Sequence, residues 1–575
     1  MPQEIDRCCD LVMKGGITSG VLYPGAVQEI GKRFHLIGIG GTSAGAIASC
    51  VAAAAEYRRR ETGTADGFEM LEKVAEELSG EGALLSLFRP DENTKKDFKR
   101  LLKIIERKAG FFTYLGMYLG RKKIFKRLVD NGYGVCTGMA NDNVDPNKPA
   151  LTPWLSRLID EIAGKKDEPL TFRDLHNATI PPAIEHLMQG RAERSIDLRA
   201  VTTSISFERP FELPFNTNIF FFDPEEWRRL FPKYVVDFLV KKAKEISNAD
   251  EYESEGKLPL PNSDMPVIVA ARMSLSFPIL FTMVPLYAVD YHDPERRLRK
   301  NWFSDGGITS NFPMHRFDAL LPRWPTLGLN LQTTDESGKP QRRRLREPGS
   351  EEMVYLPKDR RGGVLDLWQL FDRERKNPLK LLGSDGAKLF GFLGGIFNSA
   401  QRWHDNAFLK LPGYRDRLAE IWLTPDEGGM NLNMSPKTIE DLVERGKNAG
   451  RQLVERFADL EKQEAMSWNG HRWTRFRSGM AGLMKFGTRF ENSYDIESPG
   501  ADAIADLLSG KVEPPTYTMR DDKRAAMEEV IKELLKVLAD AQSASHVCSD
   551  PNDRSTGPFC DGPRPFVDIG SRAKF

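Results

Sequence analysis

The stretch FHLIGIGGTSAGAIASCVAAAAEYRR, residues Phe34–Arg59, decides the fold. Its first seven residues are a short apolar run, which predicts a buried strand. A glycine-rich turn follows, and from Ala44 onward the alanine-rich sequence favours a helix. A strand, a tight turn and a helix in direct succession are typical of an α/β protein.

The residues before this stretch predict the same order of elements. Residues 8–13, CCDLVM, read as another short buried strand, and apolar residues at helical spacing from Val21 to Ile30 predict a helix that stops at Gly31. Pro24 is tolerated because it falls in the first turn of that helix. The chain therefore opens with a parallel, right-handed strand–helix–strand unit and a second helix after it.

Later segments extend this α/β pattern. Short apolar runs predict further buried strands at Ile196–Ser206, Pro266–Ala271 and Thr326–Leu331. Residues 421–427, IWLTPDE, predict an edge strand, and a helix capped by Ser435 is expected to run to about Lys462. Residues 333–363 read as a polar loop, and helical patterns follow over 364–407.

The turn Gly41-Thr42-Ser43-Ala44-Gly45 matches G-x-S-x-G, the pattern of a serine nucleophile on a strained strand-to-helix turn. A phosphate-binding Walker A loop is excluded because Ala46 and Ile47 follow the last glycine instead of Lys and Ser or Thr. A dinucleotide-binding fingerprint is also excluded, since Ser43 stands where its third glycine belongs. The turn therefore predicts acyl-transfer chemistry at Ser43.

A serine nucleophile needs a base and donors for the oxyanion. Trp302-Phe303-Ser304-Asp305-Gly306-Gly307 offers Asp305 as the base, because paired glycines let the carboxylate approach the serine turn. The helix that starts at Ala44 offers its first N–H groups, and Gly15 and Gly16 follow a neighbouring parallel strand. His315, ten residues after Asp305, keeps a Ser-Asp-His arrangement open as an alternative.

Composition excludes other classes of function. Lys+Arg and Asp+Glu both number 82, which gives no overall charge for binding nucleic acid. The 6 cysteines lack the spacing of a zinc site or a disulfide framework, so we expect a reducing compartment. The first residues, MPQEIDRCCD, carry acidic groups where a signal peptide is basic, and we expect no export signal and a cytoplasmic protein.

Two apolar segments with basic neighbours, Ala109–Phe125 and Leu389–Phe397, bear on contact with membranes. Their apolar runs are shorter than the roughly 18 residues that a spanning helix needs. Both segments fit buried helices, and both also fit an interfacial position where Phe, Leu and Lys are partly buried. Peripheral contact with a membrane therefore stays open.

With these motifs in place, the chain resembles the patatin-like phospholipases, acyl hydrolases that use a Ser-Asp dyad. The resemblance rests on Gly15-Gly16 with Gly20, on the Gly41–Gly45 turn, and on Asp305-Gly306-Gly307, in the order of the family. Three further segments agree with the family: Leu170–Leu175, Ser274–Phe281 and Tyr414–Arg417. The family's oxyanion loop usually reads D-G-G-G-x-[KR]-G; here Lys14, Ile17 and Ser19 depart from it, which is closer to a bacterial subgroup with G-G-x-T-S-G.

The resemblance implies a three-layer α/β/α fold with a central, mainly parallel sheet. It implies a catalytic domain at 1–60 and 168–458, a helical insertion or cap at 61–167, and a C-terminal helical extension with an irregular tail at 459–575. Ser43 would be the nucleophile, Asp305 the base, and Gly15, Gly16 and Ala44 the oxyanion donors, with Gly20, Gly41, Gly45, Gly306 and Gly307 supporting the turns. The substrate would be a phospholipid or other lipid ester.

The resemblance implies no cofactor, and no calcium loop of the form D-x-[DN]-x-[DN]-G occurs in the sequence. A catalytically weak scaffold that binds lipid, or an effector activated by a partner, remains an alternative to the enzyme. So does an esterase or thioesterase that uses His315.

Overall fold

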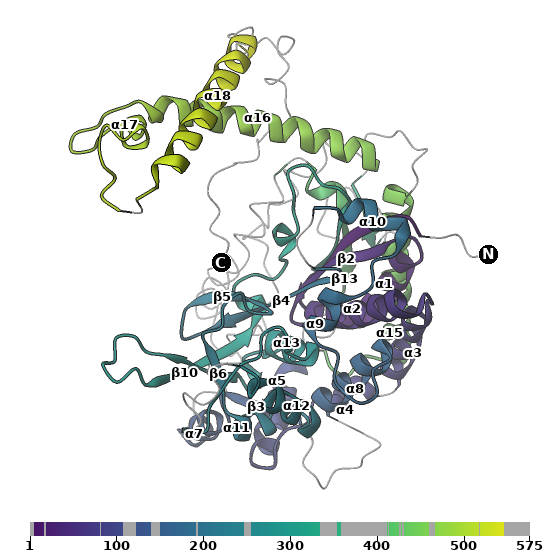
Figure 1. Cartoon of the computed structure of the whole chain (residues 1–575). Coiled ribbons are helices and arrows are strands. Elements are labelled where there is room, and N and C mark those ends of the chain that lie inside the picture. Colours follow the sequence, from purple (N-terminus) through teal and green to yellow (C-terminus); the bar gives the residue numbers. More distant parts are fainter. Residues whose placement is uncertain are drawn as a thin grey trace, which may run out of the picture.

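A mixed sheet of 11 strands forms the centre of the molecule (Figure 1). The computed structural model describes residues 5–16, 19–80, 82–106, 122–139, 150–190, 194–246, 255–333, 353–357, 411, 413–424, 427, 431–458, 466–516 and 518–545. Five central strands run parallel, in the order β13, β11, β1, β2 and β4. They are β13 Leu418–Leu423, β11 Thr326–Thr333, β1 Cys8–Met13, β2 His35–Thr42 and β4 Asp197–Ser204.

Antiparallel strands extend the parallel strands on both sides. They are β12 Val354–Tyr355 at one margin and, beyond β4, β10 Leu298–Asp305, β9 Val284–Val289, β6 Phe220–Phe222 and β7 Leu258–Pro259, with β5 Arg209–Leu213 also paired to β4. The predicted α/β fold with a central, mainly parallel sheet flanked by helices is confirmed. In this sheet β1 and β2 are adjacent and β10 lies two strands beyond β2, with β4 between them. These three strands precede the predicted site residues.

The main core lies between one face of the sheet and the helices that cover it. On β1, Cys9, Leu11 and Met13 point into this core, whereas Val12 packs on the opposite face with Met314. The helices that share this core are α1 Tyr23–Gly31, α2 Ala44–Thr62, α13 Val267–Ser274 and α15 Pro436–Ala458. Because α1 links the parallel neighbours β1 and β2, the predicted strand–helix–strand unit is present.

Residues 61–167 add helices at the edge of this core. They are α3 Asp66–Ser79, α4 Ala83–Leu87, α5 Lys95–Glu106, α7 Lys122–Asp130 and α8 Leu151–Ala163, with the short strand β3 Gly134–Cys136. The strand β3 pairs with β8 Ile279–Phe281 in a second, two-stranded sheet. These helices lie where a helical insertion was expected, and the division of the chain into domains stays a prediction.

The strand predicted at Pro266–Ala271 is wrong, because this segment begins the helix α13. Every residue of α13 is buried, since the helix packs between α2 and the sheet strand β4. A helix buried on all sides has no polar face, so its sequence lacks the helical period and reads as a short apolar run.

The edge strand predicted at 421–427 is also misplaced. The strand β13 begins at Leu418 and ends at Leu423, and it lies second from the margin because β12 pairs antiparallel with it. The strand β12 comes from the segment 333–363, predicted to be a loop, and has only two residues. The helical patterns at 364–407 lie outside the described residues.

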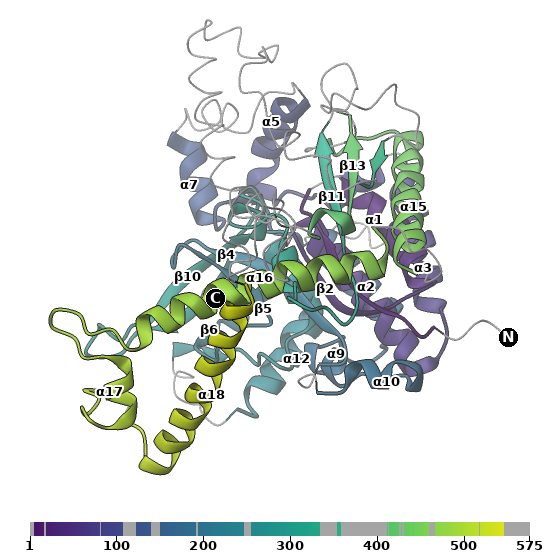
Figure 2. The same ribbon diagram turned by 90° about the horizontal axis from the view of Figure 1, so that it is seen from above.

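Helices connect and cover the remaining strands. They are α9 Phe172–Asn177, α10 Pro182–Met188, α11 Pro224–Arg228 and α12 Lys233–Ala243. At the C-terminal end, α16 Trp468–Tyr494, α17 Ile504–Ser509 and α18 Asp521–Ser545 follow α15, and Figure 2 shows α17 and α18 projecting away from the sheet. None of the helices in the described part of the chain is both long and apolar enough to cross a bilayer.

Candidate active site

Ser43 lies on a strained turn between β2 and α2. Its φ is 54° and its ψ is −127°, a backbone conformation that a residue with a side chain rarely adopts. Glycine is required on either side, because a Cβ on Gly41 would overlap the backbone of Gly45, and a Cβ on Gly45 would overlap the carbonyl oxygen of Met13. This is the geometry expected of a nucleophile turn, and such strain persists only where surrounding contacts hold it.

Ser274, the last residue of α13, provides one of those contacts. Its Oγ accepts a hydrogen bond from the N–H of Ser43 at 3.0 Å and donates to the carbonyl oxygen of Val201 on β4 at 2.6 Å. All three residues are buried. The Ser274 hydroxyl therefore ties the serine turn to the sheet, although sequence reasoning gave it no role.

Asp305 lies at the end of β10, two strands away from Ser43 in the sheet order. Its N–H donates to the carbonyl oxygen of Ser276 at 3.0 Å, and its Oδ1 accepts from the N–H of Gly307 at 2.7 Å. Gly306 is required next to it, since a Cβ there would overlap the carbonyl oxygen of Val201. These contacts fix the carboxylate on the tight turn that the paired glycines predicted.

The carboxyl of Asp305 is buried beside the side chain of Ser43. Burial raises the pKa of Asp305 to about 7, while hydrogen bonding from Ser43 and from the N–H of Gly307 acts in the opposite direction. Oδ2 makes no hydrogen bond of ordinary geometry with any described residue, so the approach of Ser43 is looser than a full hydrogen bond. A carboxyl group that titrates near neutrality can accept and return a proton at physiological pH.

The predicted oxyanion loop follows β1. The N–H of Gly15 donates to the carbonyl oxygen of Asn311 at 3.0 Å, and the Oγ1 of Thr42 donates to the same oxygen at 2.9 Å. In this conformation the Gly15 N–H thus holds the loop against the serine turn and is not directed at a ligand. Gly16 lies one residue further along the loop, and Ala44 is the first residue of α2, where N–H groups have no partner within the helix.

Lys14 anchors the same loop from its other side. Its Nζ donates to the Oδ1 of Asn330 at 2.9 Å and to the carbonyl oxygen of Leu331 at 2.7 Å, both on β11. The hydroxyl of Tyr23 donates to the carbonyl oxygen of Lys14. The lysine that stands where relatives of this loop carry an acid therefore binds the loop to the sheet.

Arg272 is a second residue that sequence reasoning missed. Its guanidinium is fully buried and donates to the carbonyl oxygens of Thr137 and Thr282, both at 2.9 Å, and to the Oγ of Ser276 at 2.7 Å. Burial lowers the pKa of Arg272 to about 10. Because Ser276 carries the acceptor for the Asp305 N–H, Arg272 links the insertion to the turn that holds Asp305.

His315 lies in the short 3-10 helix η5, Met314–Arg316. Among the described residues, the Asp305 carboxyl accepts a hydrogen bond from the N–H of Gly307 and lies beside Ser43, and His315 does not contribute to the pKa of Asp305. The structure thus brings together Ser43 and Asp305 without the histidine. Within the described ranges, no group of three or more His, Cys, Asp or Glu residues is placed to hold a metal ion.

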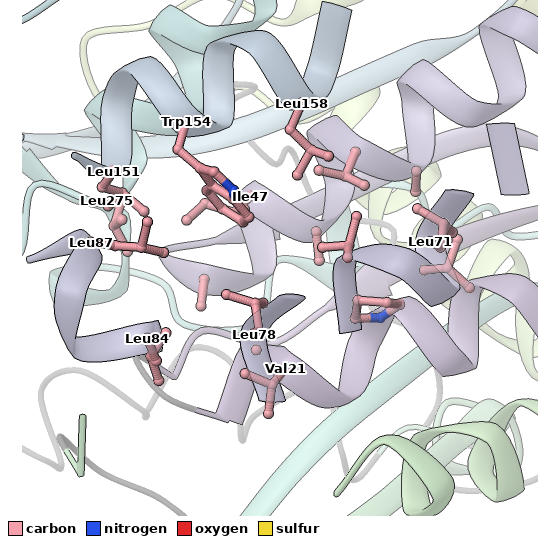
Figure 3. Close-up of a pocket in the computed structure, with 18 of the residues that line it drawn as sticks. Val21, Ile47, Leu71, Leu78, Leu84, Leu87, Leu151, Trp154, Leu158 and Leu275 are labelled. Atoms are coloured by element: carbon pink, nitrogen blue, oxygen red, sulfur yellow. The ribbon is translucent and has the colours of Figure 1, made fainter. Parts of the chain in front are cut away.

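An apolar cavity opens beside the serine turn, with about 760 Å³ of empty space that includes its opening. Ala44, Gly20 and Leu275 line it next to Ser43. Figure 3 shows Leu275, Leu151 and Leu87 at one end and Leu71 and Leu158 toward the other. Its lining is hydrocarbon almost throughout, which suits an apolar chain better than a charged or sugar-like group.

Comparison with known proteins places this site in context. The family model described as "Patatin-like phospholipase" matches residues 11–318, a range that includes Ser43 and Asp305. The "RpoH suppressor" of Rhizobium meliloti (strain 1021) is 31% identical over 657 residues, covering 94% of this chain and 95% of the relative. Among solved structures, VipD from Legionella pneumophila is similar at 14% identity with a TM-score of 0.30, covering 94% of this chain and 88% of that chain.

Proposed function

The chain belongs to the patatin-like phospholipase family, and on this premise we propose that it is a serine acyl hydrolase that releases fatty acids from membrane lipid esters. The observation that carries the proposal is the position of Ser43, on a strained turn beside the buried carboxyl of Asp305. The apolar cavity next to Ala44 supports a fatty acyl group as the part of the substrate that is bound.

In the proposed mechanism, Asp305 is the only base. Its Oδ2 takes the proton of the Ser43 hydroxyl while Oγ attacks the ester carbonyl, and the oxyanion accepts hydrogen bonds from the N–H groups of Ala44 and Gly16. The protonated Asp305 then gives its proton to the departing alcohol as the carbon–oxygen bond breaks. An acyl ester on Ser43 remains.

Water completes the cycle through the same two residues. Asp305 removes a proton from the water as it attacks the acyl-Ser43 carbonyl, and the second oxyanion binds the same N–H groups. Collapse releases the fatty acid and returns the proton to Ser43. A base with a pKa of about 7 suits both directions of transfer, because neither protonation state is strongly favoured at neutral pH.

A second candidate is an effector of the same chemistry that needs an activating partner or lipid surface. The hydrogen bond from Gly15 to Asn311 favours it, since this N–H must turn away from Asn311 before it can serve an oxyanion. On this alternative the isolated chain reacts slowly, and contact with the activator rearranges the oxyanion loop.

Labelling with a fluorescent fluorophosphonate tests both candidates. We expect wild type to be labelled and Ser43→Ala to be unlabelled, while the matched variant Ser79→Ala, at the end of α3, is labelled like wild type. Labelling only after liposomes are added would select the activated effector. Labelling of Ser43→Ala equal to that of wild type would refute Ser43 as the nucleophile.

A further inference from the structure

One side of the apolar cavity is a single face of α2, the helix that begins directly after Ser43. The lining residues of this helix are spaced three and four apart: Ala44, Ile47, Ala48, Val51 and Ala52. With a rise of about 1.5 Å per residue, the line from Ala44 to Ala52 is about 12 Å long. The cavity therefore follows the helix axis away from the nucleophile.

Three alanines leave open space on this side of the cavity. Ala44, Ala48 and Ala52 repeat every fourth residue, so their small methyl groups lie on the same face of α2 and line the cavity. Longer side chains at these positions would occupy the space that the cavity leaves open. The cavity thus depends on the alanine-rich sequence that first predicted the helix.

The insertion supplies the opposite wall. The helix α3 contributes Leu71, Val74 and Leu78, and α8 contributes Leu151, Trp154 and Leu158. Leu84 and Leu87 come from α4, and Phe88 directly follows that helix. Figure 3 shows Trp154 and Ile47 between the two ends of the cavity. Leu71 and Leu158 lie toward the end that is remote from Leu275, so the insertion limits how far a bound chain can extend.

We propose that this cavity selects the length of the acyl chain, with Ala48 and Ala52 of α2 and Leu71 and Leu158 of the insertion as the specificity-determining residues. The inference rests on the proposed serine hydrolase function. A hydrocarbon that lies along about 12 Å of helix has roughly ten carbon atoms. Decanoyl esters are therefore the expected best substrates, and much longer chains must leave part of their length outside the cavity.

The test compares p-nitrophenyl esters of butanoate, octanoate, decanoate, dodecanoate and hexadecanoate in one detergent. We expect the kcat/KM of wild type to peak at decanoate and to fall by about tenfold or more at hexadecanoate, since a poorly accommodated methylene costs roughly tenfold or more in a fitted pocket. Ala52→Leu should move the peak to octanoate or shorter. Leu158→Ala should move the peak to a longer chain, which keeps the test decisive if Ala52→Leu fails to fold.

Matched controls carry the same side-chain changes on exposed helices away from the cavity. Ala526→Leu on α18 and Leu483→Ala on α16 should leave the chain-length profile unchanged. If Ala52→Leu and Leu158→Ala both give the wild-type profile while butanoate is still hydrolysed, the chain-length inference is overturned and the hydrolase function stands.

A binding measurement separates the two hypotheses if no ester is cleaved. In Ser43→Ala protein, displacement of a dansyl-labelled undecanoic acid should be at least about tenfold more effective with decanoate than with butanoate. Adding Ala52→Leu should weaken displacement by decanoate by a similar factor. Equal displacement by both acids would overturn the chain-length inference. Chain-dependent displacement in Ser43→Ala protein, together with no ester hydrolysis by wild type with or without liposomes, would leave chain-length selection by the cavity standing and refute the hydrolase function.

Discussion

Replacing Asp305 by Asn should stabilise the folded protein at alkaline pH while abolishing hydrolysis. Burial raises the pKa of Asp305 from 3.8 to about 7, so between these pH values the folded protein holds a proton that the unfolded chain has released. The folded state therefore loses stability as the pH rises, and the loss is complete above pH 7. A difference of about 3 pKa units at 1.36 kcal/mol each corresponds to about 4 kcal/mol.

The assay is the free energy of unfolding from urea titrations at pH 5 and pH 8. Asn is neutral at both pH values. The free energy of unfolding of Asp305→Asn should therefore exceed that of wild type by about 2 kcal/mol at pH 5 and about 4 kcal/mol at pH 8. The kcat/KM of wild type should rise with pH through about 7 as Asp305 loses its proton. A difference in the free energy of unfolding that does not grow with pH would refute the reasoning.

Asp197→Asn is a control for which the effect on stability should have the opposite sign to that of Asp305→Asn. Burial opposes ionisation of Asp197, but Arg199 and Arg194 outweigh it and hold the pKa of this carboxyl below its usual value. Asp197 therefore stabilises the fold above the pKa of the unfolded chain, and this contribution fades as the pH falls through the lower folded pKa. Asp197→Asn should be less stable than wild type at pH 8.

Gly306→Ala places a Cβ against the carbonyl oxygen of Val201, so kcat should fall by roughly a hundredfold; an unchanged kcat in a steady-state ester assay would contradict the packing. Arg272→Met should lower kcat by about tenfold or more with little change in KM, and Arg272→Lys should recover part of the loss, because Arg272 acts through Ser276. Wild-type kcat in Arg272→Met would remove its positioning role. His315→Ala should keep kcat/KM within about threefold, since loss of a true general base typically costs at least a hundredfold.

The positions of Ser43 and Asp305 could be found from the sequence because glycines mark where backbone approaches backbone. Gly45 and Gly306 each lie against a carbonyl oxygen with no room for a Cβ, and this requirement appears in the sequence as fixed motifs. The parallel pairing of β1 and β2 follows from the short connection through α1.

The contacts that hold these two residues could not be found in the same way. Ser274 donates a hydrogen bond to Val201, which lies 73 residues earlier in the sequence. Arg272 donates to Thr137, which lies 135 residues earlier, so no local sequence pattern identifies either partner. Ser274 and Arg272 both lie on α13, whose complete burial removed the helical period and led to the wrong strand prediction. Asn311 accepts the Gly15 N–H through its backbone carbonyl, and residue type gives no signal for this bond.

Mass spectrometry of the products released from mixed phospholipid liposomes tests the central claim most directly. Wild type and Ser43→Ala are compared at equal concentration with EDTA present, so that trace calcium enzymes do not contribute. We expect free fatty acids to accumulate with wild type and to stay at background with Ser43→Ala, because the acyl ester can form only on Ser43. Equal release of fatty acids by both proteins would contradict the account.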